Sequence, residues 1–189
     1  MKKIRHYLKG KRIALVGNAQ SLFDASYGEI IEQHDVVCRI NKGFTNITKS
    51  SEQYIGNRTD ILFINLYKTM RSLISVYRMS SVLRDTRFVF QMNDTDDVPD
   101  KELKIRNEML VNLKSELGSN PSTGMRCLYF LCSETMMHSC SVFGFDWKKT
   151  PSIYSQNKKD SSLSNHDFQR EQEFTNNIFA NDPRFNFYG

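Results

Sequence analysis

The sequence has no long run of apolar residues, no internal repeat and no low-complexity linker. No stretch approaches the roughly 18 consecutive apolar residues that a membrane-spanning helix needs. We therefore expect neither a membrane anchor nor a cleavable signal sequence. A chain of 189 residues with an ordinary share of charged side chains is expected to fold as a single domain over residues 1–189 with one core.

Cysteine is scarce, and each of the four cysteines stands among apolar residues. This setting favours buried thiols in a reducing compartment over disulfides. Their spacing from one another and from the nearest histidine fits no common zinc module, so we predict no metal site at these residues. The four residues are Cys38, Cys127, Cys132 and Cys140.

Positive charge exceeds negative charge by five, and much of the excess lies at the N-terminus. We interpret residues 1–11 as a solvated basic arm. An excess of positive charge favours anionic partners such as nucleotides, nucleic acids or an anionic membrane surface. Aromatic residues are not interleaved with the lysines as a base-stacking surface requires, which argues against nucleic acid.

Segments rich in β-branched and aromatic residues alternate with segments of helical periodicity. The alternation predicts an α/β fold, a Rossmann-like domain with a mostly parallel sheet flanked by helices. In such sheets ligands bind beyond the carboxyl ends of the strands. The predicted strands are 12–16, 35–41, 59–65, 87–91, 140–145 and 185–189, and the predicted helices are 28–33, 67–83, 101–117, 123–134 and 165–179.

The loop after the first predicted strand contains one glycine where a dinucleotide-binding fingerprint has three, which counts against NAD and S-adenosylmethionine. Gly17 still permits a close approach of backbone to a ligand, and Asn18 can donate and accept hydrogen bonds. Asn41 ends the second strand and should lie beside Asn18 if the two strands are neighbours. Two amides at adjacent strand ends suit the ribose and phosphate of a nucleotide.

Two further segments could hold an anion or a metal. In PSTG, Ser122 and Thr123 stand at the start of a predicted helix, where hydroxyls, backbone amides and the helix dipole favour an anion. Asp94 and Asp96 form a D-x-D sequence after the fourth predicted strand, the form in which many metal-dependent glycosyltransferases hold a divalent ion. An acidic turn before Pro99 explains the same residues without a metal.

Taken together, these segments resemble glycosyltransferase family 29, the sialyltransferases. IALVGNAQSLFDASYGEIIEQHDVVCRIN is similar to the large motif of that family, and PSTGMRCLYFLC with VFGFDW is similar to the small motif. Tyr154 resembles part of the third motif, and His166 and Glu171 have the H-x4-E form of the very small motif. The motifs occur in the order of the family and span nearly the whole chain, so the resemblance implies a glycosyltransferase domain over residues 1–189.

The sequence departs from the family pattern in two places. The large motif of the family begins with a cysteine that pairs with one in the small motif, whereas Ile13 stands there and the small motif lacks its usual cysteine. The family disulfide is therefore expected to be missing, which favours a cytosolic protein of microbial or viral origin. In the third motif only Tyr154 fits, because the second aromatic residue is absent.

The resemblance implies an inverting transfer of sialic acid from CMP-sialic acid to a hydroxyl of a glycan or lipid-linked glycan. The donor carries one phosphate and one carboxylate, so hydrogen bonds and helix dipoles can take the place of a metal, and no metal or cofactor is expected. By this resemblance Asn18 and Asn41, with Gly17 and Ala19 in the first loop, hold the phosphate and ribose.

The remaining donor contacts implied by the resemblance lie in the second half of the chain. Ser122, Thr123 and Gly124 are expected to hold the donor carboxylate. Gly144 and Phe145, at the end of the fifth predicted strand, are expected to line the cytidine pocket.

The resemblance makes His166 the general base that activates the acceptor hydroxyl. It stands at the start of a predicted helix, where the partial positive charge of the helix end disfavours protonation of the ring. We therefore expect the imidazole to be neutral near pH 7. Tyr154 is expected to donate a hydrogen bond to the departing phosphate. Glu171 follows His166 by five residues, so it does not lie directly above it on the helix, and we expect an orienting or structural role.

Three alternatives remain open at this point. One is a transferase of the same fold that uses CMP-Kdo, and another is a metal-dependent nucleotide-sugar transferase that uses Asp94 and Asp96. The third is a non-catalytic nucleotide-binding or RNA-binding module. We expect a cytoplasmic protein, with peripheral contact between the basic arm and the inner face of the membrane as a hypothesis.

Overall fold

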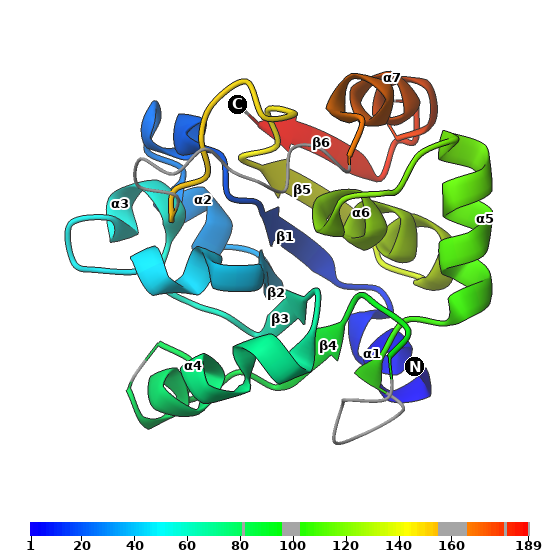
Figure 1. Cartoon of the computed structure of the whole chain (residues 1–189). Helices are drawn as coiled ribbons and strands as arrows, with labels where there is room; N and C mark the ends of the chain where they lie inside the picture. The colour runs from blue at the N-terminus through cyan, green and yellow to red at the C-terminus, as the bar shows by residue number, and fades with distance from the viewer. Residues whose placement is uncertain (81, 96–102, 155–165, 180, 189) are drawn as a thin grey trace.

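The computed structural model describes residues 1–80, 82–95, 103–154, 166–179 and 181–188. Its six strands form one sheet in the order β4-β3-β2-β1-β5-β6 (Figure 1). Every neighbouring pair is parallel, which confirms the predicted α/β fold with a mostly parallel sheet. The strands are β1 (Arg12–Val16), β2 (Val36–Ile40), β3 (Ile61–Ile64), β4 (Phe88–Gln91), β5 (Ser139–Phe143) and β6 (Phe185–Tyr188).

Helices cover both faces of the sheet (Figure 1). Along the described part of the chain, no helix is both long enough and apolar enough to span a membrane. The helices are α1 (Lys2–Leu8), α2 (Gly28–Glu32), α3 (Glu52–Ile55), α4 (Tyr67–Met79), α5 (Asn107–Leu117), α6 (Thr123–Glu134) and α7 (Phe168–Ile178), with 3-10 turns η1 (Gln20–Phe23) and η2 (Asn41–Asn46).

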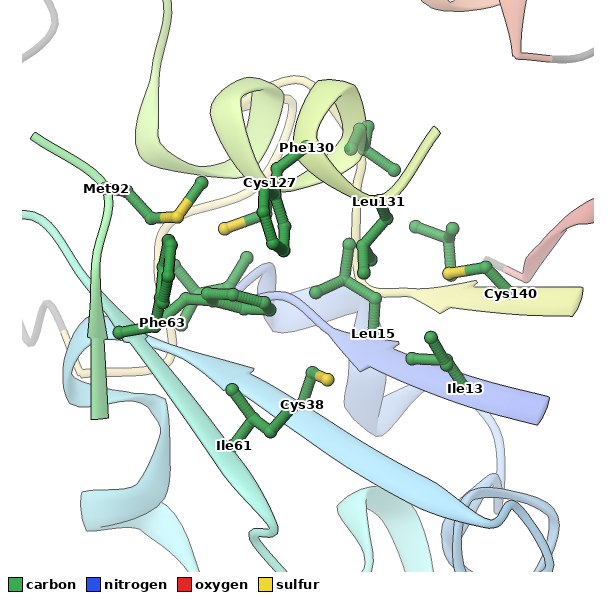
Figure 2. Close-up of a cluster of buried hydrophobic side chains, with 14 of the residues drawn as sticks. Ile13, Leu15, Cys38, Ile61, Phe63, Met92, Cys127, Phe130, Leu131 and Cys140 are labelled. Carbon is green, nitrogen blue, oxygen red and sulfur yellow. The ribbon is translucent and has the colours of Figure 1, made fainter. Parts of the chain in front are cut away.

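Alternate residues of each strand pack on opposite faces, as the two-residue period of a strand requires. Ile13 and Leu15 of β1 belong to the larger cluster, which contains buried residues of α1, α5 and α6. Figure 2 shows this cluster, with Phe63 of β3 beneath Phe130 of α6. Ala14 and Val16 belong to a second cluster with η1, α2 and α3, so β1 is buried on both faces.

Four of the predicted helices and the sixth strand are found near their expected bounds. Residues 123–134 were predicted as a helix, and α6 has those bounds. The helix predicted from residue 101 begins at Asn107 as α5, and Gly118 ends it in the left-handed conformation at φ 69°. The 3-10 turns and α3 were not predicted, because they are too short to show a period.

The predicted solvated arm at residues 1–11 is wrong, because residues 2–8 form α1 and pack on the sheet. Ile4 and Leu8 are fully buried in the larger cluster, while Lys2, Lys3 and Lys9 remain exposed. Isoleucine and leucine four positions apart lie on one face of a helix, and that short apolar stripe outweighs the surrounding charge.

The four thiols are free, and those of Cys38, Cys127 and Cys140 are buried. Burial raises the pKa of the Cys38 and Cys127 thiols well above the ordinary value. Cys132 is half-buried beside Asp182 and Arg184. The prediction of buried thiols is thus confirmed for three of the four residues.

We predict that Leu8→Ala lowers the free energy of unfolding by about 2–5 kcal/mol, because it removes a fully buried side chain and leaves a cavity. Urea denaturation measures this change. The neighbouring substitution Lys9→Ala is the control, since Lys9 is exposed, and it should change stability by less than about 0.5 kcal/mol. Equal stability of the two variants would show that α1 does not contribute to the core.

Candidate active site

A pocket of about 160 Å³ lies at the carboxyl ends of β1, β2 and β5. The strand order reverses beside β1, because the chain continues to β2 on one side and later to β5 on the other, and ligands of open α/β sheets bind at such a point. All twelve predicted site residues line this one pocket. They are Gly17, Asn18, Ala19, Asn41, Ser122, Thr123, Gly124, Gly144, Phe145, Tyr154, His166 and Glu171.

Asn18 presents an amide oxygen that has no hydrogen-bond partner within the described residues. Its Nδ2 donates to the carbonyl of Ile40 at the end of β2, over 3.1 Å. A Cβ added to Gly43 would lie 2.3 Å from Oδ1 of Asn18, so only glycine leaves room for this side chain. This oxygen is buried and unsatisfied, so a ligand hydroxyl or amine that reached it would supply the missing hydrogen bond.

Asn41 follows β2 in a left-handed backbone conformation with φ 48°. Asparagine is one of the few residues other than glycine that enter this region at low cost. Its Oδ1 accepts a hydrogen bond from the backbone N–H of Asn65, over 2.9 Å. The loop after β2 is therefore tied to the loop after β3, and the Nδ2 group of Asn41 can serve as a donor in the pocket.

The ring of Phe145 packs tightly between two glycines of the site. A Cβ on Gly17 would lie 2.8 Å from this ring, and a Cβ on Gly124 would lie 2.9 Å from it. Gly144 has φ 66°, and a Cβ there would also meet Leu22 at 2.5 Å. Small residues at these positions therefore let the first loop, the end of β5 and the start of α6 meet around one aromatic ring.

The segment that contains Tyr154 is paired to the first loop. Ala19 and Ser152 form an antiparallel bridge, and the N–H of Ile153 donates to the carbonyl of Asn18 over 2.8 Å. This pairing holds the third-motif segment over the pocket, although the sequence shows little periodicity there. Tyr154 itself lines the pocket.

Several residues that line the pocket were not predicted from the sequence. Trp147 and Lys148 follow FGFD and adopt consecutive left-handed conformations with φ 57° and 63°. Nζ of Lys148 donates to the hydroxyl of Ser152 over 2.6 Å. A strained pair of non-glycine residues beside a ligand pocket is a feature of functional sites, but no sequence pattern reports it. The pocket is also lined by Ile40, Asp146, Thr150, Ser152 and Phe168.

Glu171 is fully buried in α7 and holds the start of α6. Its Oε1 accepts a hydrogen bond from the N–H of Ser122 over 2.6 Å, and its Oε2 accepts from the Ser122 hydroxyl over 2.7 Å. The hydroxyl oxygen in turn accepts from the N–H of Met125 over 3.2 Å and caps the helix. Both donors of Ser122 are thus already used, which leaves Thr123 and Gly124 to supply N–H groups to a ligand.

Burial raises the pKa of the Glu171 carboxyl above its ordinary value, although the two hydrogen bonds from Ser122 act in the opposite direction. The charge of Arg126, and that of His166 whenever its ring is protonated, also act to lower this pKa. The net result is a carboxyl that is less easily ionised than an exposed one.

His166 stands two residues before α7 and lines the pocket. Its Nδ1 lies 2.8 Å from the carbonyl oxygen of Asn120. A carbonyl oxygen only accepts hydrogen bonds, so Nδ1 carries the proton in this contact, and the neutral ring keeps its lone pair on Nε2. The geometry suits a group that takes a proton from a ligand.

The D-x-D sequence does not contribute to this pocket as far as the structure describes it. Asp94 forms an ion pair with Lys104 over 2.6 Å and is absent from the pocket lining. Asp96 lies outside the described residues. Across the described ranges, no three histidine, cysteine or acidic side chains gather in a way that could bind a metal ion.

Two curated proteins are similar to this chain in sequence. The mouse CMP-N-acetylneuraminate-beta-galactosamide-alpha-2,3-sialyltransferase 1 is 25% identical over 192 residues, covering 89% of this chain and 55% of that protein. The Arabidopsis thaliana beta-1,6-galactosyltransferase GALT29A is 38% identical over 52 residues, covering 28% of this chain and 12% of that protein. The chain thus spans about half the length of the mouse relative. Neither relative supports the predicted microbial or viral origin.

The fold is shared with a mammalian sialyltransferase that was crystallised with Gal-beta-1-3GalNAc-ortho-nitrophenol. The TM-score is 0.62 at 20% sequence identity, and the match covers 97% of this chain and 71% of that one. The model of glycosyltransferase family 29 (sialyltransferase) matches residues 5–100, which is slightly more than half of the chain and includes Asn18 and Asn41. The chain therefore belongs to glycosyltransferase family 29.

Proposed function

We propose that this protein transfers sialic acid from CMP-sialic acid to a sugar hydroxyl, with inversion and without a metal ion. The observation that carries the proposal is the gathering of all twelve predicted site residues around one pocket. These residues come from segments as far apart as Gly17 and Glu171, so chance alone does not bring them together. Membership of the family and the name of the mouse relative support the choice of donor.

In this proposal the nucleotide lies across the carboxyl ends of β2, β1 and β5. Asn18 and Asn41 contact the ribose and phosphate, since one offers an unpartnered oxygen and the other an amide donor. Phe145 and Gly144 line the space for the cytosine. The first N–H groups of α6, those of Thr123 and Gly124, have no acceptor within the helix and can bind the donor carboxylate.

His166 is proposed as the general base. It accepts the proton of the acceptor hydroxyl on Nε2 while that oxygen attacks the anomeric carbon of sialic acid. The bond to the phosphate oxygen breaks on the opposite face, and CMP leaves with the bonding electrons. Asn120 holds the ring from the other side through its carbonyl, which keeps Nε2 as the basic nitrogen during the attack.

Ser122 and Glu171 have supporting roles in the proposal. The sequence assigned Ser122 to the donor carboxylate, but its N–H and hydroxyl both donate to Glu171. Glu171 therefore acts through Ser122 by fixing the helix end that binds the anion. Because α7 begins two residues after His166, one short segment positions the proposed base and the anion-binding turn together.

No divalent ion is needed in this proposal. CMP carries a single phosphate and leaves readily, so there is no diphosphate to neutralise. The positive end of α6, at the edge of the pocket, can compensate part of the charge of the donor. For the same reason the proposal assigns no metal-binding role to Asp94 and Asp96, and Asp94 forms an ion pair with Lys104 instead.

We predict that the protein binds CMP in the presence of excess chelator and that Asn18→Ala raises the dissociation constant by about tenfold. The loss follows from removing the unpartnered oxygen and the bond to Ile40. Isothermal titration calorimetry measures both values. Asn112→Ala on the exposed side of α5 is the matched control and should bind CMP as the wild type does. Binding of CDP or UDP only with manganese would favour the metal-dependent alternative.

We predict that His166→Ala lowers the rate of transfer by about 10²–10⁴-fold and leaves the affinity for CMP unchanged. A Gal-beta-1-3GalNAc glycoside, the sugar in the matched mammalian complex, is a suitable first acceptor. Product formation from CMP-sialic acid and from CMP-Kdo in parallel decides between the two donor sugars. His6→Ala, at an exposed position of α1, is the control. Full activity of the His166 variant would rule out its role as base.

We predict that Glu171 stabilises the fold less as the pH rises. A carboxyl whose pKa is raised by folding binds more protons in the folded state, so its contribution is full below 4.5, the ordinary value, and is lost as the pH rises through the folded value. The free energy of unfolding of the wild type, relative to Glu171→Gln, should therefore decrease from pH 4.5 towards neutrality. Urea denaturation at several pH values measures it. A constant difference would contradict a raised pKa.

A further inference from the structure

A buried arginine lies behind the anion-binding turn without lining the pocket. Arg126 belongs to the first turns of α6, and only 8% of its surface is exposed. Its Nε donates to the carbonyl of Pro121 over 3.0 Å, and its Nη1 donates to the carbonyl of Met92 over 3.0 Å. Nη1 also donates to Oδ1 of Asn65 over 3.3 Å. The guanidinium thus contacts three separate loops at the carboxyl edge of the sheet.

Two charged side chains hold the same peptide group from opposite ends. The carbonyl of Pro121 accepts from Arg126, and the N–H of the next residue, Ser122, donates to Glu171. A peptide group has only these two polar atoms, so its plane cannot rotate without breaking one of the bonds. The orientation of this peptide determines where the N–H groups of Thr123 and Gly124 point.

The same arginine also reaches Asn41 through one intermediate residue. Asn65 accepts from Arg126 with its side chain and donates with its backbone N–H to Oδ1 of Asn41. Asn41 and the start of α6 line the same pocket from different elements. The side chain of Arg126 therefore fixes the position of Asn41 relative to the start of α6.

A buried cation with neutral partners is an expensive way to stabilise a fold. The hydrogen bonds of Arg126 go to two carbonyl oxygens and an amide oxygen. Burial lowers the pKa of Arg126, although the side chain of an arginine stays charged. Burying a charge carries a desolvation cost that hydrogen bonds to neutral groups offset only in part, so the energetic argument points to a role other than stability.

We propose that Arg126 is a positioning residue for donor binding. It aligns the Pro121–Ser122 peptide and Asn41, so that the N–H groups of Thr123 and Gly124 and the amide of Asn41 can contact one anionic donor together. The inference rests on the proposed function and extends it to a residue outside the pocket. Arg126 acts only through these groups and touches no reacting atom.

The test compares Arg126→Met with Arg39→Met, because the chain offers a second buried arginine as a matched control. Arg39 of β2 is 1% exposed and donates to the carbonyls of Ile55 and Arg58 and to the hydroxyl of Thr59. None of its partners lines the pocket. Both substitutions remove a buried guanidinium, but only Arg126→Met removes one that is hydrogen-bonded to the segments around the pocket.

Two readouts are taken on the folded protein, well below its melting temperature. Hydrogen exchange of the amides in residues 119–126 reports the position of the turn, and calorimetry reports the affinity for CMP. We expect Arg126→Met alone to speed exchange in this segment and to raise the dissociation constant for CMP by about tenfold. If this variant does not fold, Arg126→Lys replaces it, since lysine keeps the cation but lacks the fork that reaches two carbonyls.

Unchanged exchange and affinity in a folded Arg126 variant would overturn the inference. So would an equal effect of Arg39→Met, which would show general destabilisation. A wild-type protein that binds no CMP would instead overturn the proposed function, and the exchange data would still decide whether Arg126 positions the turn.

Discussion

The parallel pairing of β1 with both β2 and β5 is the constraint on which the site depends. Because parallel strands end at the same edge, this pairing places Gly17 and Asn18, Asn41, and Gly144 and Phe145 side by side. Burial of β1 on both faces maintains the pairing, since alternate residues belong to two separate apolar clusters. A shift of register would bury polar residues and separate the loops, so the core and the site are stabilised by the same contacts.

The second half of the chain completes the pocket through buried polar contacts. Glu171 of α7 and Arg126 of α6 hold the Pro121–Ser122 peptide between them, and His166 is oriented by the carbonyl of Asn120. Such contacts cost desolvation energy and are specific in direction. They therefore contribute more to the shape of the site than to the stability of the fold. These contacts hold the proposed anion-binding turn and the proposed base in fixed positions.

The predicted elements were correct where the apolar pattern is long or strongly β-branched. The bounds of α6 agree with the prediction because PST marks its start and eight consecutive residues after it are mostly apolar. The N-terminal segment was misjudged because the number of lysines obscured the spacing of Ile4 and Leu8. Trp147 and Lys148 were missed because left-handed conformations of non-glycine residues have no signature in the sequence.

The sequence by itself determined the class of fold, the order of the motifs and twelve of the residues that line the pocket. These follow from local periodicity, from residue types at strand and helix ends and from the resemblance of the motifs to a family, which are all properties of short segments. Only the tertiary structure decided that Ser122 is engaged by Glu171, that Asn18 keeps an unpartnered oxygen and that Arg126 links three loops. Contacts between residues 49 or 61 positions apart depend on how whole elements pack, and no local pattern specifies them.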